Sequence, residues 1–138
     1  MEKEEFVELL NQDLSTEYQS IVQYTQHIAT IKGAQYQALI EELRQHVSQE
    51  LTHAMTLANQ VDFLGGVPTV AVPQIVNEPD DDAALRQDLA LETAQLQRYR
   101  DRVAQAGDLG LPDVAEALKP LLTQTQDHVM ELRTALGQ

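Results

Sequence analysis

The chain has 138 residues, a formal net charge of −13 and no cysteine. Its length and its ordinary apolar content predict one globular domain over residues 1–138. The absence of cysteine excludes a disulfide framework, a thiolate zinc site and an iron–sulfur cluster. The acidic charge argues against nucleic acid as a partner.

The sequence contains no apolar run long enough to span a bilayer and no basic-then-apolar leader pattern at its start. We therefore expect a cytoplasmic protein that does not bind membranes.

A first helix is predicted over about residues 2–32, because apolar side chains recur there at steps of three and four. Gly33 ends it, and the same periodicity predicts a second helix over about residues 35–63. Gly65 and Gly66 end the second helix, as glycines beyond a helix commonly do. These two helices should form an antiparallel hairpin, since only a short turn joins them.

Residues 65–79 cannot be helical, because three prolines interrupt them: Pro68, Pro73 and Pro79. An extended chain covers about 3.3 Å per residue, so this segment can travel about 45 Å. It therefore predicts a crossover that runs the length of a helical bundle.

The third helix should begin at Asp80, Asp81 and Asp82, whose charges suit the positive end of a helix dipole. It should end before Gly107 and Gly110. Pro112 opens the fourth helix, since proline is favourable in a first turn, and Pro120 should kink it. The prediction is an all-α four-helix bundle with a long crossover between its second and third helices.

Three glutamates, Glu17, Glu50 and Glu92, occupy positions that the periodic pattern reserves for apolar residues. A buried carboxylate without a partner costs several kcal/mol, so something must compensate it, and a metal ion is the natural candidate. At 1.5 Å rise per residue, Glu17 and Glu50 both lie about 25 Å from the turn that joins their helices. Glu92 should lie at the same level from the second turn.

Two histidines are spaced to join these glutamates. His53 follows Glu50 by three residues, which places both on one helical face. The interval from Glu17 to Glu50 is repeated from Glu92 to Thr125, and His128 follows Thr125 by three residues. The two predicted hairpins therefore present the same pattern, with threonine where the repeat requires glutamate. The candidate site residues are Glu17, Glu50, His53, Glu92 and His128.

Four other polar residues lie near these positions. Tyr24 shares the stripe of Glu17 and is as consistent with core packing as with the site. Asp88 lies one turn before Glu92 and could orient a ligating histidine, or cap a helix or face solvent. His46 lies one turn before Glu50. We expect it on the surface, with an extra ligand or a part of an ion path as the alternatives. His27 gives no usable signal.

The chain resembles bacterioferritin and the wider ferritin-like di-iron carboxylate superfamily. Three stretches carry the resemblance: residues 17–24, the Glu50-to-His53 box with residues 63–68 after it, and residues 88–92. The resemblance implies two irons, with Glu50 and Glu92 bridging or sharing them. It also implies that Glu17 and His53 complete one metal, and that His128 binds the other. Such centres react Fe(II) with O2 or H2O2, so the resemblance implies a ferroxidase or another oxidoreductase.

The chain departs from bacterioferritin in three ways. Thr125 replaces a ligand glutamate, so one metal should bind more weakly or take solvent instead. Leu51 stands where bacterioferritin has its haem-binding methionine, so no haem is expected. The sequence given stops after the fourth helix, so the large storage shell is not expected.

Three hypotheses remain open from the sequence. The protein is an iron-handling redox enzyme, a bundle with one occupied metal site, or a structural or partner-binding bundle. Glutamate and imidazole ligands suit iron or manganese, and zinc stays possible. We also expect a homodimer or higher homo-oligomer, because the outer faces of the first two helices carry Tyr18, Leu39 and Leu51 off the main apolar stripe, which offers surface for an isologous contact.

Overall fold

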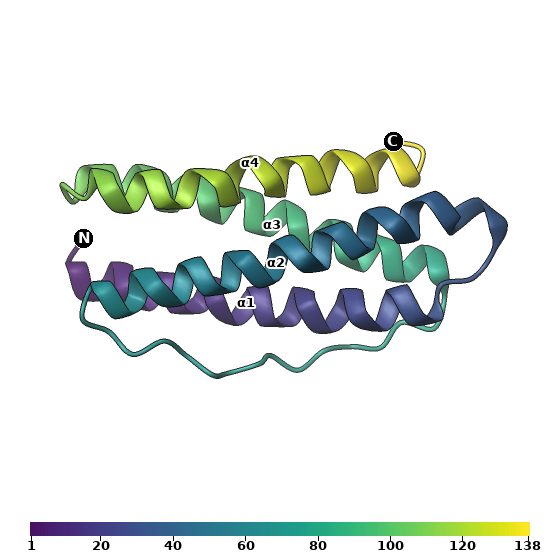
Figure 1. Ribbon diagram of the computed structural model, residues 1–138, viewed down its shortest axis with the longest axis horizontal. Helices are drawn as coiled ribbons and strands as arrows, with labels where there is room; N and C mark the ends of the chain where they lie inside the picture. Colours follow the sequence, from purple (N-terminus) through teal and green to yellow (C-terminus); the bar gives the residue numbers. More distant parts are fainter.

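The computed structural model describes all 138 residues and contains four long helices (Figure 1). They are α1 (Lys3–Thr30), α2 (Gln37–Phe63), α3 (Asp81–Asp108) and α4 (Pro112–Ala135), with a short 3-10 turn η1 (Ala34–Tyr36) before α2. α1 and α2 form one antiparallel hairpin, and α3 and α4 form the other. The predicted all-α four-helix bundle is confirmed.

The ends of the helices follow from local chemistry. The Asp80 side chain accepts a hydrogen bond from the backbone N–H of Ala83 and caps α3, and two more aspartates lie in the first turn. Gly33 turns the chain between α1 and α2 with a φ of 118°, a value that side chains rarely allow. Contrary to the prediction, α3 continues through Gly107. Pro120 lies inside α4, as predicted.

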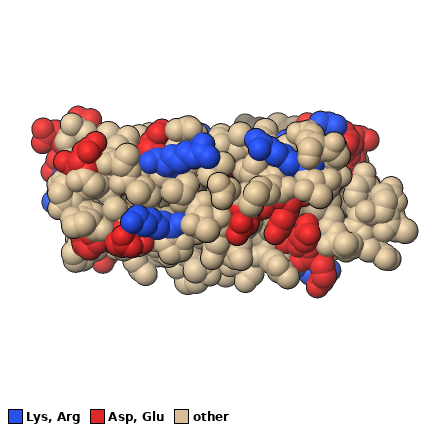
Figure 2. All heavy atoms as spheres, turned by 90° about the horizontal axis from the view of Figure 1, so that it is seen from above, with Lys and Arg blue, Asp and Glu red and all other residues tan.

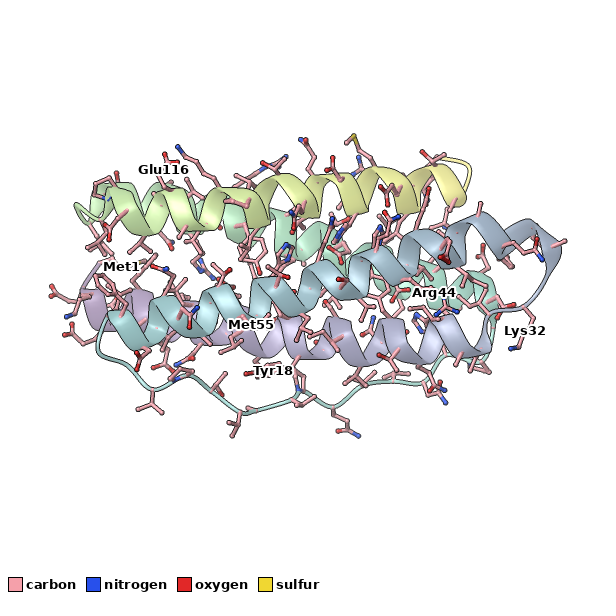
Figure 3. All side chains as sticks on the ribbon, viewed as in Figure 1. Met1, Tyr18, Lys32, Arg44, Met55 and Glu116 are labelled. Atoms are coloured by element: carbon pink, nitrogen blue, oxygen red, sulfur yellow. The ribbon has the colours of Figure 1, made fainter.

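The crossover, residues 64–80, runs along α1 on the outside of the bundle, as the prolines predicted (Figure 1). Side chains of α1 hold it there by bonding its backbone. Asn11 donates to the carbonyl of Val67 over 3.0 Å and accepts from the N–H of Thr69 over 2.9 Å. Tyr18, labelled in Figure 3, donates to the carbonyl of Thr69 over 3.1 Å. These bonds satisfy backbone groups that no regular structure pairs.

Two apolar clusters fill the bundle. One lies toward the start of α1 and includes Phe6, Leu57 and Leu118, and the other lies toward the end of α1 and includes Ile31, Leu43 and Leu132. Leu39 belongs to the second cluster and is buried, so its predicted place on an outer face was wrong.

Two observations concern the surface. Basic side chains on the face shown in Figure 2 are separated from one another, while acidic side chains lie toward the left end and in a group right of the centre. No helix combines the length and apolar character that crossing a membrane requires.

Candidate metal centre

Midway along the bundle, five buried acidic and imidazole side chains converge from four helices. They form two groups whose donor atoms all lie within 4.8 Å of one another. The first group is Glu17, Glu50 and His53, and the second is Glu50, Glu92 and His128. Each side chain is at most 2% exposed. The structure thus brings together every candidate residue that the sequence indicated, with Glu50 common to both groups.

The inward atoms of both histidines are the Nδ1 nitrogens. Nδ1 of His53 lies 3.7 Å from Glu17 and 3.6 Å from Glu50. Nδ1 of His128 lies 2.8 Å from Glu50 and 3.4 Å from Glu92. Two donors on one octahedral ion at about 2.1 Å each lie about 3 to 4 Å apart, so these separations have the scale of a shared ion.

The outward nitrogens of the two histidines are fixed by glutamines of the other hairpin. Nε2 of His53 donates to Oε1 of Gln124 over 2.7 Å, and Nε2 of His128 donates to Oε1 of Gln49 over 2.6 Å. Because an amide oxygen only accepts, each histidine carries its proton on Nε2. A neutral ring then turns its Nδ1 lone pair toward the carboxylates, an arrangement that a cation between them stabilises.

Several atoms of the centre are buried without any hydrogen-bond partner. They are Oε2 of Glu17, Oε1 of Glu50, Nδ1 of both histidines and Oγ1 of Thr125. Native proteins rarely leave buried polar atoms unpaired, because each unpaired atom costs about 1–3 kcal/mol. The unpaired donors therefore fit a metal ion as their common partner.

Two buried tyrosines support the glutamates. Tyr24 donates to Glu92 over 2.9 Å, and Tyr99 donates to Glu17. Burial and the neighbouring carboxylates raise the pKa of both phenols well above 10, so both stay neutral donors. Tyr24, which the sequence left undecided between the core and the site, contacts the site directly.

The buried carboxylates of the centre repel one another. Burial and the charges of Glu17 and Glu92 raise the pKa of Glu50 well above its usual value. Burial would also raise the pKa of Glu17, but Glu50, His53 and Tyr99 outweigh it and lower that pKa. Burial lowers the pKa of His53, but Glu17, Gln124 and Glu92 together outweigh it, so the net shift is upward. A cation placed among these groups relieves the repulsion.

The two hairpins repeat the centre with an offset of 75 positions. Glu17 corresponds to Glu92, His53 to His128 and Tyr24 to Tyr99, and Glu50 corresponds to Thr125. The supporting ion pairs follow the same offset in their acidic partners, Asp13 and Asp88. Asp13 binds Arg102 through two hydrogen bonds, and Asp88 binds His27 over 2.7 Å.

These ion pairs show what the sequence missed. Asp88 orients His27 and also accepts from Gln23. The sequence had suggested that Asp88 could orient a ligating histidine, but it bonds neither histidine of the centre. His27 is buried, although the sequence gave no signal for it. The offset of 75 positions was the available signal, since it relates Asp13 to Asp88 and His27 to Arg102.

His46 was expected on the surface, and this expectation was wrong, because only 1% of it is exposed. Its ring stacks on His128 with centroids 3.9 Å apart, and its Nε2 lies 2.5 Å from Glu131. The position of His46 one turn before Glu50 placed it on the same helical face, and that face is buried. His46 belongs to neither ligand group.

Comparison with known proteins agrees with this geometry. The family model described as "Ferritin-like domain" matches residues 7–138. The chain belongs to the ferritin-like family. Members of this family bind metal ions and commonly form oligomers.

Two solved structures illustrate the likeness. The crystal structure of ferritin-like, diiron-carboxylate proteins from Bacillus anthracis str. Ames is 30% identical to this chain. The TM-score is 0.92, and the match covers 99% of each chain. Bacterioferritin of Rhodobacter capsulatus, described with a metal-free dinuclear site and haem iron, is 24% identical with a TM-score of 0.85. That match covers 96% of this ferritin-like chain and 84% of bacterioferritin, and it supports the fold alone.

Proposed function

We propose that this ferritin-like protein binds two iron ions and oxidises Fe(II) with O2 or H2O2. The observation that carries the proposal is the pair of inward Nδ1 atoms, each facing buried carboxylates without a hydrogen-bond partner. The di-iron carboxylate description of the Bacillus anthracis relative supports the choice of iron over manganese or zinc.

In this proposal each residue has a separate part. Glu17 and His53 hold the first metal, Glu92 and His128 hold the second, and Glu50 binds both. Two ferrous ions together supply two electrons, which suffice to reduce O2 to peroxide or peroxide to water. Tyr24 and Tyr99 hold the terminal glutamates in place by donating to one oxygen of each.

The decisive experiment is an anaerobic Fe(II) titration with elemental analysis, followed by mixing with O2 or H2O2. Two irons per chain, and ferric absorbance that rises with oxidant consumption, are the expected results. One iron per chain would favour the bundle with a single occupied site. No iron after loading would favour a structural or partner-binding role.

Two matched variants of α2 distinguish the loss of a carboxylate in the centre from the loss of a carboxylate on the surface. Glu50→Gln keeps the side-chain shape, removes the shared carboxylate and should lower both iron binding and oxidation. Glu41→Gln makes the same chemical change on the exposed face of the same helix and should leave both unchanged.

We also propose that the protein forms a homodimer through the outer face of α1 and α2. Leu51 and Met55 lie one turn apart on α2, are 53% and 54% exposed, and offer apolar surface for a two-fold contact. Light scattering should give twice the chain mass, and Leu51→Lys should lower it. A monomer mass for the wild type at working concentration would refute the proposal.

A further inference from the structure

Thr125 is a buried residue of α4 whose hydroxyl has no hydrogen-bond partner. It precedes His128 by three residues, as Glu50 precedes His53, and therefore lies on the same helical face as His128. The repeat between the hairpins makes Thr125 the counterpart of Glu50. At this position α4 therefore has an unpaired hydroxyl, whereas α2 has the carboxylate of Glu50.

Threonine is a smaller side chain than the glutamate that the repeat places at this position. Glutamate has five heavy atoms beyond Cα and threonine has three, so the difference equals a ligand of about two heavy atoms. Threonine also offers only a neutral hydroxyl, which can donate a hydrogen bond to such a ligand.

The carboxylates of the centre are also too few to neutralise two divalent ions. Two divalent ions carry one more positive charge than Glu17, Glu50 and Glu92 can neutralise, and no other acidic residue belongs to the two ligand groups. Asp13 and Asp88 are bound to Arg102 and His27, and Glu131 pairs with His46. The remaining positive charge has no partner in the chain, so an anion from solvent is the fitting partner.

We propose that Thr125 opens a binding site for one small exogenous anion, such as hydroxide or azide, on the second metal beside His128. This inference rests on the proposed function, because it requires that both metals bind. The anion completes the ligands of the second metal, and Thr125 donates a hydrogen bond to it.

The test uses Co2+, which has a visible spectrum and does not react with dioxygen in this role, and azide as the anion. Co2+ is first titrated to establish how many ions bind. Azide is then titrated into the loaded protein, and the change in the d–d bands gives its affinity. Wild type should bind one azide per centre.

Variants at position 125 separate space from hydrogen bonding. Thr125→Glu fills the position with a carboxylate and should weaken azide binding at least about tenfold while keeping two Co2+ ions. Thr125→Val keeps the space without the hydroxyl and should weaken azide binding about 3- to 10-fold. Thr123→Glu adds the same charge on the exposed side of α4 and should change nothing.

The outcomes distinguish the two claims. Failure of the wild type to bind Co2+ would overturn the proposed function and this inference with it. Two bound Co2+ ions with equal azide affinity in wild type and Thr125→Glu would overturn the inference alone. If Thr125→Glu does not fold, the Thr125→Val comparison decides, and an unchanged azide affinity there is the contrary result.

Discussion

Gln49 accepts a 2.6 Å hydrogen bond from Nε2 of His128, which lies on the opposite hairpin. Gln124 makes the reciprocal bond with His53. Each hairpin therefore sets the ring orientation and the proton position of the histidine that belongs to the other. Both glutamines come directly before a position of the ligand repeat, Glu50 or Thr125. The repeat position faces the centre, and the residue before it binds the histidine of the other hairpin.

Removing one of these glutamines should weaken metal binding without unfolding the protein. Gln124→Leu frees Nε2 of His53, so the ring can turn its lone pair away from the centre, and metal affinity should fall about tenfold. Competition with a chromophoric chelator measures the affinity, and long-range 1H–15N NMR reports the histidine proton. Gln126→Leu, on the exposed side of the same helix, is the control. Equal affinity for Gln124→Leu and wild type would contradict a positioning role.

Metal should stabilise the fold substantially. A ligand that binds only the folded state adds about 2.7 kcal/mol at a hundredfold excess over Kd, which should raise Tm by on the order of 10 °C for a domain of this size. Thermal melts with and without chelator measure the shift. Identical midpoints after verified metal removal would argue strongly against a metal centre at these residues.

The metal-free protein should lose stability as pH rises, and Glu50 should contribute to that loss. Burial and the charges of Glu17 and Glu92 raise the folded-state pKa of Glu50 well above its ordinary value of 4.5. Folding therefore favours the protonated acid, and its contribution is present below pH 4.5 and lost as pH rises through the folded pKa. Metal-free Glu50→Gln cannot ionise and should melt higher than metal-free wild type at neutral pH.

Melts of both metal-free proteins between about pH 5 and 8 measure this difference. Asp88, whose pKa burial also raises, keeps its own slope in both proteins, so the difference reports Glu50 together with Glu17, whose pKa Glu50 lowers. A difference in Tm that stays constant with pH would contradict the predicted role of Glu50.

Replacing only one partner of the buried Asp13–Arg102 ion pair should destabilise the fold. Arg102 binds both oxygens of Asp13, at 2.8 and 3.2 Å. Arg102→Met leaves a buried carboxylate without its partner and should lower the free energy of unfolding by about 3–5 kcal/mol. Urea denaturation measures the loss. The double change Arg102→Met with Asp13→Leu should recover most of it, whereas Arg100→Met on the exposed face should cost little.

The protein should not bind haem through α2. Leu51 offers no sulfur ligand, and it lies on the exposed side of the helix, away from the buried centre. Hemin added to the purified protein should give only the spectrum of free hemin. A stoichiometric Soret band would show that another residue binds the haem.

The fold and the five centre residues could be predicted because they rest on periodicity within single helices. Glu17, Glu50 and Glu92 stand out where the pattern requires apolar residues, and His53 follows by a helical step. This information lies along the chain and needs no knowledge of the neighbouring helix.

The supporting shell could not be predicted because it depends on which residues meet across helices. Gln49 and Gln124 lie one position away from the repeat positions, where a glutamine usually faces solvent. His46 was misjudged because its polar character was given more weight than its place on the buried face. Leu39 was misjudged because the second core cluster extends further around α2 than the main stripe.

If two metals bind as proposed, the place of Glu50 in the first hairpin would impose an order on their binding. The first group of donors, Glu17, Glu50 and His53, lies wholly within the α1–α2 hairpin, which ribosomes complete before α3 and α4. The second group lacks a carboxylate at Thr125 and must take Glu50 from that earlier hairpin. An ion that binds the nascent hairpin would therefore find all three donors of the first group already synthesised. The second position comes into existence only when the later helices dock.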